Sequence, residues 1–224
     1  MSLRDVRLQE AIPVQWAGFS TGTPTKDPLR GRYSRGGVAP SGLSANSRVE
    51  TLRGAVAARD LQIGDQVKTY DGSFAELRWV GTSRPLMNND LPMRRQNADG
   101  SDSTTLLTPE HLVLIEDDRC IALFGRRDVL CPAKYLAANG HYAPDADVNP
   151  VFVHLLFDSY VLVKSGEDWV ESLSPDMDQI RIDDQDTAQE ITRHLPRLAS
   201  LQGLASYVQT RPVLDAREAD LLFQ

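Results

Sequence analysis

Short apolar runs separated by turn residues follow one another from about residue 48 onward, and this pattern constrains the fold most. The clearest case is QVKTYDGSFAELRWV, residues 66–80, where Asp71-Gly72 lies between two runs rich in valine, threonine and aromatic residues. Asp-Gly in this setting is a strong signal for a β-hairpin. Further strand candidates are RVET (48–51), HLVLI (111–115), VFVHLLF (151–157), YVLVKSG (160–166) and DWVESL (168–173). Many short strands with close turns predict a mainly β domain of sandwich or barrel type.

Two shorter segments refine this prediction. We expect HLVLI and CIALF (120–124) to form a second hairpin around the acidic turn EDDR. The segment PAKYLAANG is helix-like, because Pro132 suits a first helical turn and Gly140 suits a helix stop.

The periodicity changes after about Pro175. DTAQEITRHL opens with Asp186 and Gln189 at the spacing of a capping box, and DAREADLLF repeats this spacing with Asp215 and Glu218. The sequence therefore predicts three parts, namely an N-terminal extension and linker (1–41), a β domain (42–175) and a C-terminal helical extension (176–224).

Composition excludes several classes of function. A formal net charge of −7 gives no electrostatic footprint for nucleic acid or an acidic membrane, and RGRYSRGG within the Gly/Ser/Pro-rich linker 20–47 is too short to change this. We see no signal peptide and no apolar run of membrane-spanning length, so the default expectation is cytoplasmic, with signal-peptide-independent export left open.

We expect no metal site and no cofactor. Two cysteines, Cys120 and Cys131, make neither a disulfide scaffold nor a zinc framework, and two buried free thiols are favoured over a bridge. Residues 145–149 begin like a calcium loop, but Pro150 stands where an EF-hand needs glycine and Leu156 where it needs glutamate.

The stretch LLTPEHLVLI, residues 106–115, places Thr108-Pro109-Glu110-His111 inside an apolar run. In a straight strand, Thr108 and His111 would lie on opposite faces. Proline at the second position favours a type I turn, which would bring both side chains toward one point. Histidine suits proton donation near neutral pH, and a threonine hydroxyl can hold a backbone group. The pattern indicates either a turn with a structural histidine or part of a catalytic site.

The stretch RVETLRGAVAARDLQIGDQVKTYDG, residues 48–72, resembles the opening block of Hint domains, the self-processing domains of hedgehog proteins and inteins. The likeness is greatest to the stand-alone bacterial Hint proteins. LLTPEHLVLI resembles the second block, whose signature is Thr-x-x-His. Residues 123–140 and 151–175 resemble later blocks of the family, in the same order. Residues 211–222 resemble the C-terminal helix that the bacterial proteins often carry. The motifs are specific as an ordered set and cover residues 42–222.

This resemblance implies a Hint-like fold with a C-terminal helical tail, and an autoprocessing activity without a cofactor. In active Hint domains the first residue, cysteine or serine, attacks the preceding carbonyl and converts an amide to a (thio)ester. The histidine protonates the departing nitrogen and the threonine orients the scissile peptide, roles that the resemblance assigns to His111 and Thr108. The substrate would be the chain's own N-terminal segment.

The first position departs from the family pattern. Counting back from Thr51 places it at Gly42, which has no side chain, whereas the similar GFSTGT at 18–23 lies too far upstream. Ser41 and Ser44 lie nearby, but a shift by one residue moves the target carbonyl by about 3.8 Å. The terminal His-Asn of inteins is replaced by ESLSP at 171–175, and Tyr160 stands where related proteins have histidine.

Two more residues complete the candidate site. His154, in the apolar run VFVHLLF, is either a hydrogen-bonded core residue or a relic of the site. Asp158 either closes a hairpin or orients the imidazole of His111.

Three functions follow. The first is a Hint scaffold that has lost self-cleavage. The second is an active self-processing domain that uses Ser41 or Ser44 with Thr108 and His111, or that releases residues 1–41 by hydrolysis. The third is a non-catalytic β binding module without processing ancestry. The protein partner is not specified by the sequence.

Overall fold

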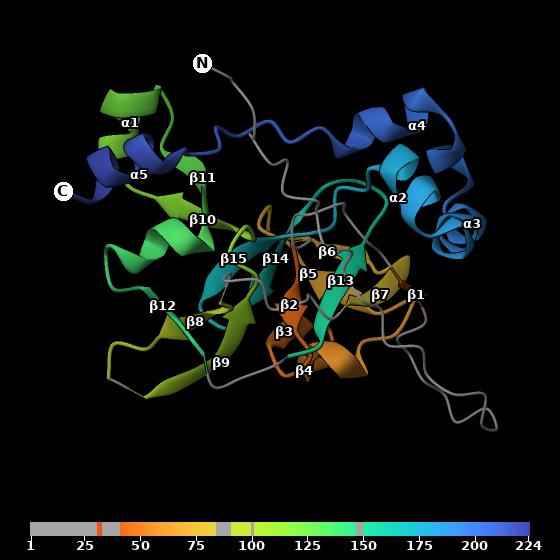
Figure 1. Cartoon of the computed structure of the whole chain (residues 1–224), viewed down its shortest axis with the longest axis horizontal. Helices are drawn as coiled ribbons and strands as arrows, with labels where there is room; N and C mark the ends of the chain where they lie inside the picture. Colours follow the sequence, from red (N-terminus) through yellow and green to blue (C-terminus); the bar gives the residue numbers. More distant parts are fainter. Residues whose placement is uncertain (1–30, 33–40, 84–90, 100, 147–149) are drawn as a thin grey trace, which may run out of the picture.

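Two curved sheets form the body of the protein, as the hairpin signals predict. Figure 1 shows the computed structural model, which describes residues 31–32, 41–83, 91–99, 101–146 and 150–224. The first sheet has the strand order β1 (Gly31–Arg32), β7 (Trp79–Ser83), β13 (Phe152–Leu156), β2 (Leu43–Ser44), β9 (Asp102–Leu107), β8 (Met93–Gln96) and β12 (Tyr142–Pro144). The second has the order β11 (Asp128–Pro132), β10 (Leu112–Glu116), β15 (Asp168–Glu171), β14 (Leu162–Ser165), β3 (Arg48–Thr51), β5 (Gln66–Lys68) and β6 (Phe74–Glu76), and β4 (Gly54–Ala57) pairs with β3.

Helices are short and lie mostly in the C-terminal part. The α-helices are α1 (Arg119–Phe124), α2 (Met177–Asp183), α3 (Gln185–His194), α4 (Leu201–Leu204) and α5 (Ala216–Phe223). Short 3₁₀ turns are Ala58–Asp60, Ala133–Ala137, Pro196–Ala199 and Ala205–Tyr207. A β-rich domain with a helical tail is therefore confirmed.

The Asp-Gly hairpin is present. Strands β5 and β6 pair antiparallel with Lys68 opposite Phe74, and Gly72 takes a φ of 84°, which a side chain would disfavour. The strand expectations for RVET and for the cluster 151–173 are also met, by β3 and by β13, β14 and β15.

The prediction of a hairpin between HLVLI and CIALF is wrong. CIALF lies in α1, and β10 pairs instead with β11, Val113 opposite Cys131. The Asp117 carboxylate accepts the Arg119 N–H at 2.8 Å, and Gly125 ends the helix with a φ of 72°. The run lacks the alternation of a half-buried strand, which is why turn chemistry at its two ends decides its structure.

Two helix starts differ from the expectation. Pro132 precedes a single 3₁₀ turn rather than lying in a full helical turn, although Gly140 has the positive φ expected of a stop. Helix α3 is capped by Asp184, whose side chain accepts the Thr187 N–H, and not by Asp186. The capping box of Asp215 and Glu218 at α5 is confirmed.

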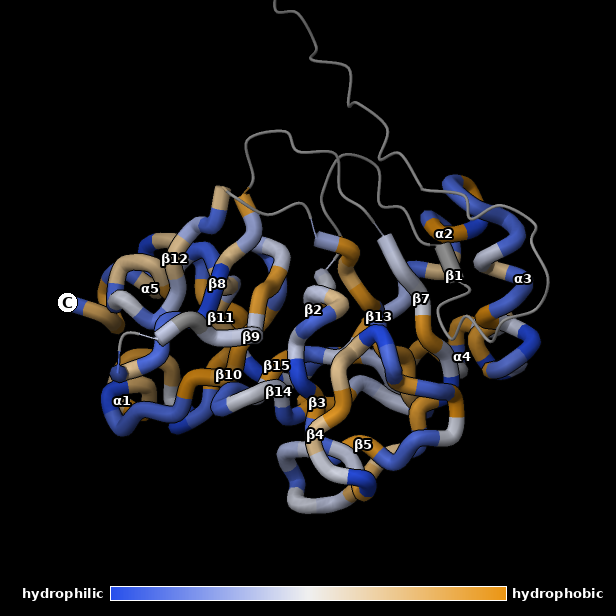
Figure 2. The backbone as a smooth tube through the Cα atoms, turned by 90° about the horizontal axis from the view of Figure 1, so that it is seen from below, coloured by the Kyte–Doolittle hydropathy of each residue, from blue (hydrophilic) through white to orange (hydrophobic). Residues whose placement is uncertain are grey.

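The helical tail packs on the β body at both ends (Figures 1 and 2). Helices α2 and α3 bury Ile180 and Ile191 with Trp79 and Leu156 of the first sheet in one apolar cluster. Helix α5 contributes Leu222 to the main core of the sheets. The segment 176–224 therefore shares its hydrophobic cores with the β domain.

Candidate functional site

Strand register brings Gly42 between two of the candidate residues. Strand β2 lies between β9 and β13, with Leu43 opposite Leu107 on one side and opposite Val153 on the other. In antiparallel pairs the preceding residue, Gly42, then faces Thr108 and His154. Residues far apart in the sequence are thus gathered at one peptide bond by sheet pairing.

The peptide joining Ser41 and Gly42 is held at both of its polar groups. The carbonyl oxygen of Ser41 lies 2.7 Å from His154 Nδ1, and the N–H of Gly42 donates to Thr108 Oγ1 at 3.1 Å. The N–H of Thr108 in turn donates to the Gly42 carbonyl at 3.1 Å. We call this arrangement the cradle of peptide 41–42. It polarises the carbonyl and orients the amide nitrogen of that one bond.

The partners of His154 determine its protonation. A carbonyl oxygen only accepts hydrogen bonds, so Nδ1 must carry the proton and donate to Ser41. The ring nitrogen Nε2 then accepts from the Ser83 hydroxyl at 2.8 Å. His154 is buried, and burial lowers its pKa to about 4, so the ring is neutral at physiological pH. Ser83, at the end of β7, was missed because a lone serine in a strand carries no local signal.

Only one ring nitrogen of His111 has a hydrogen-bond partner among the described residues. Its Nδ1 lies 3.0 Å from the Ser41 hydroxyl, while its buried Nε2 has no hydrogen-bond partner among the described residues. Burial and, secondarily, the nearby His154 lower the pKa of His111 to about 3. Because a buried unpaired N–H is rarer than a buried unpaired lone pair, the favoured tautomer carries its proton on Nδ1 and donates to Ser41.

The Thr108–His111 turn is present as the sequence predicts. The N–H of His111 donates to the Thr108 carbonyl at 3.1 Å, closing the turn. The backbone of the neighbouring segment anchors it, since Lys134 N–H donates to the Pro109 carbonyl at 3.0 Å. Both side chains point to the cradle, which explains their three-residue spacing.

The space beside Gly42 is filled. A Cβ built on Gly42 would lie 2.9 Å from Phe152 Cβ, closer than real Cβ contacts come, and 3.0 Å from His154 Cε1, tighter than most real Cβ contacts. Glycine is therefore required for β2 to approach β13 this closely. The first position of the site lacks a nucleophile and also lacks room for one.

The other predicted residues lie elsewhere. Ser44 is buried with its hydroxyl 3.0 Å from the Ser47 hydroxyl. Asp158 is 60% exposed and contacts Arg78 and Arg197 at 3.8 and 3.4 Å, linking the β body to the tail. Tyr160 packs with a separate apolar cluster, and its buried hydroxyl has no hydrogen-bond partner among the described residues. In the part of the chain that is described, the residues gathered here are thus Ser41, Gly42, Thr108, His154 and, through the Ser41 hydroxyl, His111, which is included in the cradle from here on.

Other classes of site find no support in the described ranges. Within them, no three His, Cys, Asp or Glu side chains are grouped as metal ligands would be. Cys120 and Cys131 are both free and buried. None of the helices in these ranges combines the length and apolarity needed to cross a membrane. The segment GFSTGT lies outside the described residues.

Comparison with known proteins identifies the family to which this chain belongs. The sequence matches the family model of the Hint domain over residues 41–177, more than half of the chain. The chain belongs to the Hint domain family. The match begins at Ser41, beside the position that the sequence assigns to the nucleophile. This finding favours Hint ancestry over the alternative of a β module unrelated to Hint domains.

Solved inteins resemble this Hint domain at low identity. The gp41-1 intein is 12% identical, with 60% of this chain and 100% of that chain covered and a TM-score of 0.36. A splice-inactive variant of the AceL NrdHF class 3 split intein is 14% identical, covers 60% and 99%, and has a TM-score of 0.40. The MchDnaB-1 intein is 12% identical, covers 58% and 99%, and has a TM-score of 0.35. Among curated proteins, none matches.

Proposed function

We propose that this Hint domain keeps an autoprocessing scaffold but does not cleave its own chain, at Gly42 or beside it. The observation that carries the proposal is the closed first position, where Phe152 and His154 occupy the space that a side chain at residue 42 would need. An acyl shift at this bond needs a thiol or hydroxyl on residue 42, and glycine has neither. The cradle then serves to hold residues 41 and 42 on the first sheet.

The hydrogen bonds of the cradle support this stable role. In the favoured tautomer, His111 donates to Ser41 and has no lone pair on Nδ1 with which to accept a proton. His154 is already satisfied at both ring nitrogens, by Ser41 and Ser83. The arrangement thus stabilises the intact peptide through four hydrogen bonds around residues 41 and 42.

The test is the intact mass of the full chain carrying an N-terminal tag, before and after long incubation with a thiol and with hydroxylamine. We expect one unbroken mass under every condition, because no ester forms that these nucleophiles could cut. A fragment that ends at residue 40 or 41 would overturn the proposal.

A second function, self-processing at Ser41, is favoured by one observation, the 3.0 Å separation of Ser41 Oγ from His111 Nδ1. In this reaction Ser41 Oγ attacks the carbonyl carbon of residue 40, and its proton passes to Nδ1. The bond from that carbon to the Ser41 nitrogen breaks as His111 returns the proton to the nitrogen. Water then hydrolyses the ester and releases residues 1–40. This route needs the less favoured tautomer of His111.

The two functions predict different products. Self-processing at Ser41 gives a fragment that ends at residue 40 and, with hydroxylamine, its hydroxamate. His111→Ala and Ser41→Ala should each abolish that fragment, whereas Ser44→Ala should leave it unchanged. Cleavage that persists in His111→Ala would exclude the Ser41 route.

A further inference from the structure

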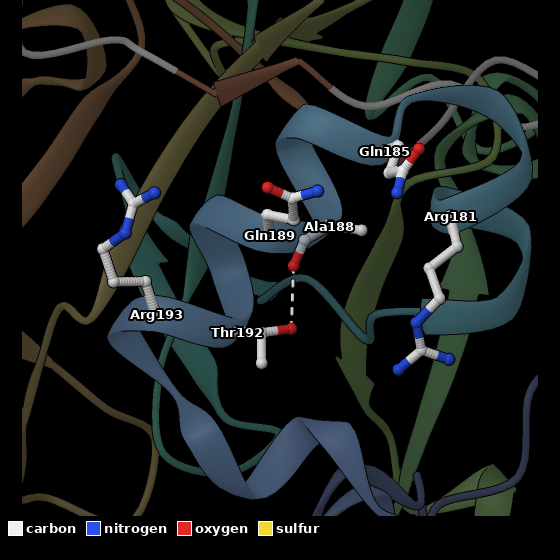
Figure 3. A pocket seen from close by; sticks show the side chains of 6 residues that line it. All are labelled: Arg181, Gln185, Ala188, Gln189, Thr192 and Arg193. Carbon is white, nitrogen blue, oxygen red and sulfur yellow. Dashed lines mark hydrogen bonds between the residues drawn. The ribbon is translucent and has the colours of Figure 1, made fainter.

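Strand β1 lies at the edge of the first sheet, next to the helical tail. Gly31 and Arg32 pair in parallel with Gly81 and Thr82 of β7, at the edge of the sheet that also carries Gly42 and His154. Strand β1 also lies next to α3 (Figures 1 and 3). The described chain therefore begins, at Gly31, beside this helix.

A pocket of about 520 Å³ is lined by residues of α2 and α3. Its lining is Arg181, Gln185, Ala188, Gln189, Thr192 and Arg193. Figure 3 shows Arg181 and Arg193 on opposite sides, with Ala188, Gln189 and Thr192 between them. The volume is within the range of pockets that enclose a drug-sized group. Two guanidinium groups flanking small and uncharged side chains suit aromatic rings, because arginine stacks on aromatic faces.

The chain contains a segment of matching chemistry upstream of β1. Residues 11–19, AIPVQWAGF, carry no charge and include Ile12, Val14, Trp16 and Phe19. We propose that residues 11–19 of the same chain dock in the α2–α3 pocket, with Trp16 or Phe19 against the arginines. This inference goes beyond the proposed function and does not depend on whether the chain is cleaved.

The tether makes the docking feasible. Residues 20–30 separate this segment from β1 and can span up to about 3.3 Å per residue, far more than the length of α3. A short flexible linker gives an effective concentration on the order of millimolar, so modest contacts suffice.

Trp16 is a built-in probe. Of the three tryptophans, Trp79 is fully buried and Trp169 is half-buried, so subtracting the signal of a Trp16→Phe variant isolates Trp16 in the full-length protein. We expect Trp16 to be protected from acrylamide quenching. In Gln185→Glu/Gln189→Glu both new carboxylates would line the pocket with Arg181 and Arg193, the one at 189 at i,i+4 spacing from Arg193 within α3. They would compete for the guanidinium groups, so Trp16 quenching should rise severalfold.

The matched control is Gln202→Glu, an exposed glutamine on α4, which should leave Trp16 protected. The assignment is overturned if Trp16 is quenched as readily as in a free peptide of residues 11–19, or if the double variant changes nothing. Protection that disappears on dilution would also overturn it, because a second copy would then supply the segment. Intact mass measured on the same samples keeps this result separate from that of the cleavage test.

Discussion

At the residue scale, the two histidines of the cradle differ in how fully they are bonded. His154 uses both ring nitrogens, whereas His111 leaves Nε2 without a partner among the described residues. Both rings are buried, so both are neutral near pH 7. Neutral histidine is what allows His154 to donate to one group and accept from another.

These rings predict a loss of stability in acid. The pKa of His154 is about 4 and that of His111 about 3 in the folded protein, against 6.5 for an unperturbed histidine. Between these values the unfolded chain binds more protons, so the free energy of unfolding falls as pH falls below about 6.5. For His154 the full loss is on the order of 3 kcal/mol, since one pKa unit is worth about 1.4 kcal/mol.

Urea unfolding at a series of pH values measures this dependence. His154→Gln removes one titrating ring but keeps a donor and an acceptor, so its stability should fall less steeply between pH 6.5 and 4. His141→Gln, at an exposed histidine, should keep the steep fall. Equal slopes in both variants would contradict the assignment of the pH dependence to the cradle.

Gly42 carries a second prediction at this scale. Gly42→Cys supplies the missing thiol, but its Cβ collides with Phe152 and His154 and must push β2 from β13. We expect a destabilisation of about 1–3 kcal/mol and no thiol-induced cleavage, because misplacement by about 1 Å costs roughly a hundredfold in rate. Intact mass with added thiol checks this. Efficient cleavage of Gly42→Cys would mean that only the nucleophile had been lost.

At the scale of elements, residues at the ends decide where helices start and stop. Asp184 accepts the Thr187 N–H at 3.0 Å and caps α3, while Asp186 lies inside its first turn. Asp184 and Asp186 lie two residues apart in the sequence. The capping-box spacing from Asp186 to Gln189 favours Asp186, which is not the residue that caps the helix. The cap depends on which aspartate has an extended backbone, and that follows from how α2 ends at Asp184.

The two aspartates provide a matched test. Asp184→Ala removes the cap and should lower the free energy of unfolding by about 0.5–2 kcal/mol. Asp186→Ala removes only a favourable charge near the helix start, which is worth about 0.3–1 kcal/mol. Urea unfolding of both variants measures the difference. A larger loss for Asp186→Ala would show that the capping-box spacing had identified the cap correctly.

At the scale of the whole molecule, the helical tail and the β body share buried side chains. Ile191 of α3 is fully buried with Trp79 of β7, and the Tyr207 hydroxyl donates to the Phe157 carbonyl. Gly81 lets the Trp79 ring lie over its own strand, since a Cβ there would meet the ring at 2.0 Å. Because these contacts cross the predicted boundary at residue 176, we expect one cooperative unfolding transition.

Two isoleucines of the tail test this expectation. Ile191→Ala should destabilise the whole described fold by about 2–5 kcal/mol, because it leaves a cavity in the shared core. Ile182→Ala is the control, since Ile182 is 78% exposed, and should change stability by less than about 0.5 kcal/mol. Tryptophan fluorescence and circular dichroism should report one common midpoint in each variant. Separate midpoints for the tail and the β body would contradict it.

Local sequence determined the hairpin at Asp71-Gly72, the turn from Thr108 to His111 and the cap of α5. Each depends on residues within a few positions of one another, so turn and cap chemistry is enough to predict it. The resemblance to Hint domains came from the order of several motifs along the chain. Counting residues back from Thr51, in the first of these motifs, placed the first position of the domain at Gly42. The local pattern of CIALF predicted a strand where the structure has helix α1, because this run lacks a clear hydrophobic period.

Tertiary structure alone decided what surrounds the peptide of residues 41 and 42. His154 reaches it from β13 and Ser83 supports His154 from β7, two strands separated from Gly42 by long stretches of sequence, and no spacing rule links them. The register of β2 against β9 and β13 sets these contacts. The closed space at Gly42 is likewise a property of packing, because it depends on how near β13 comes to β2. The sequence shows that the nucleophile is absent, and only the fold shows that its place is filled.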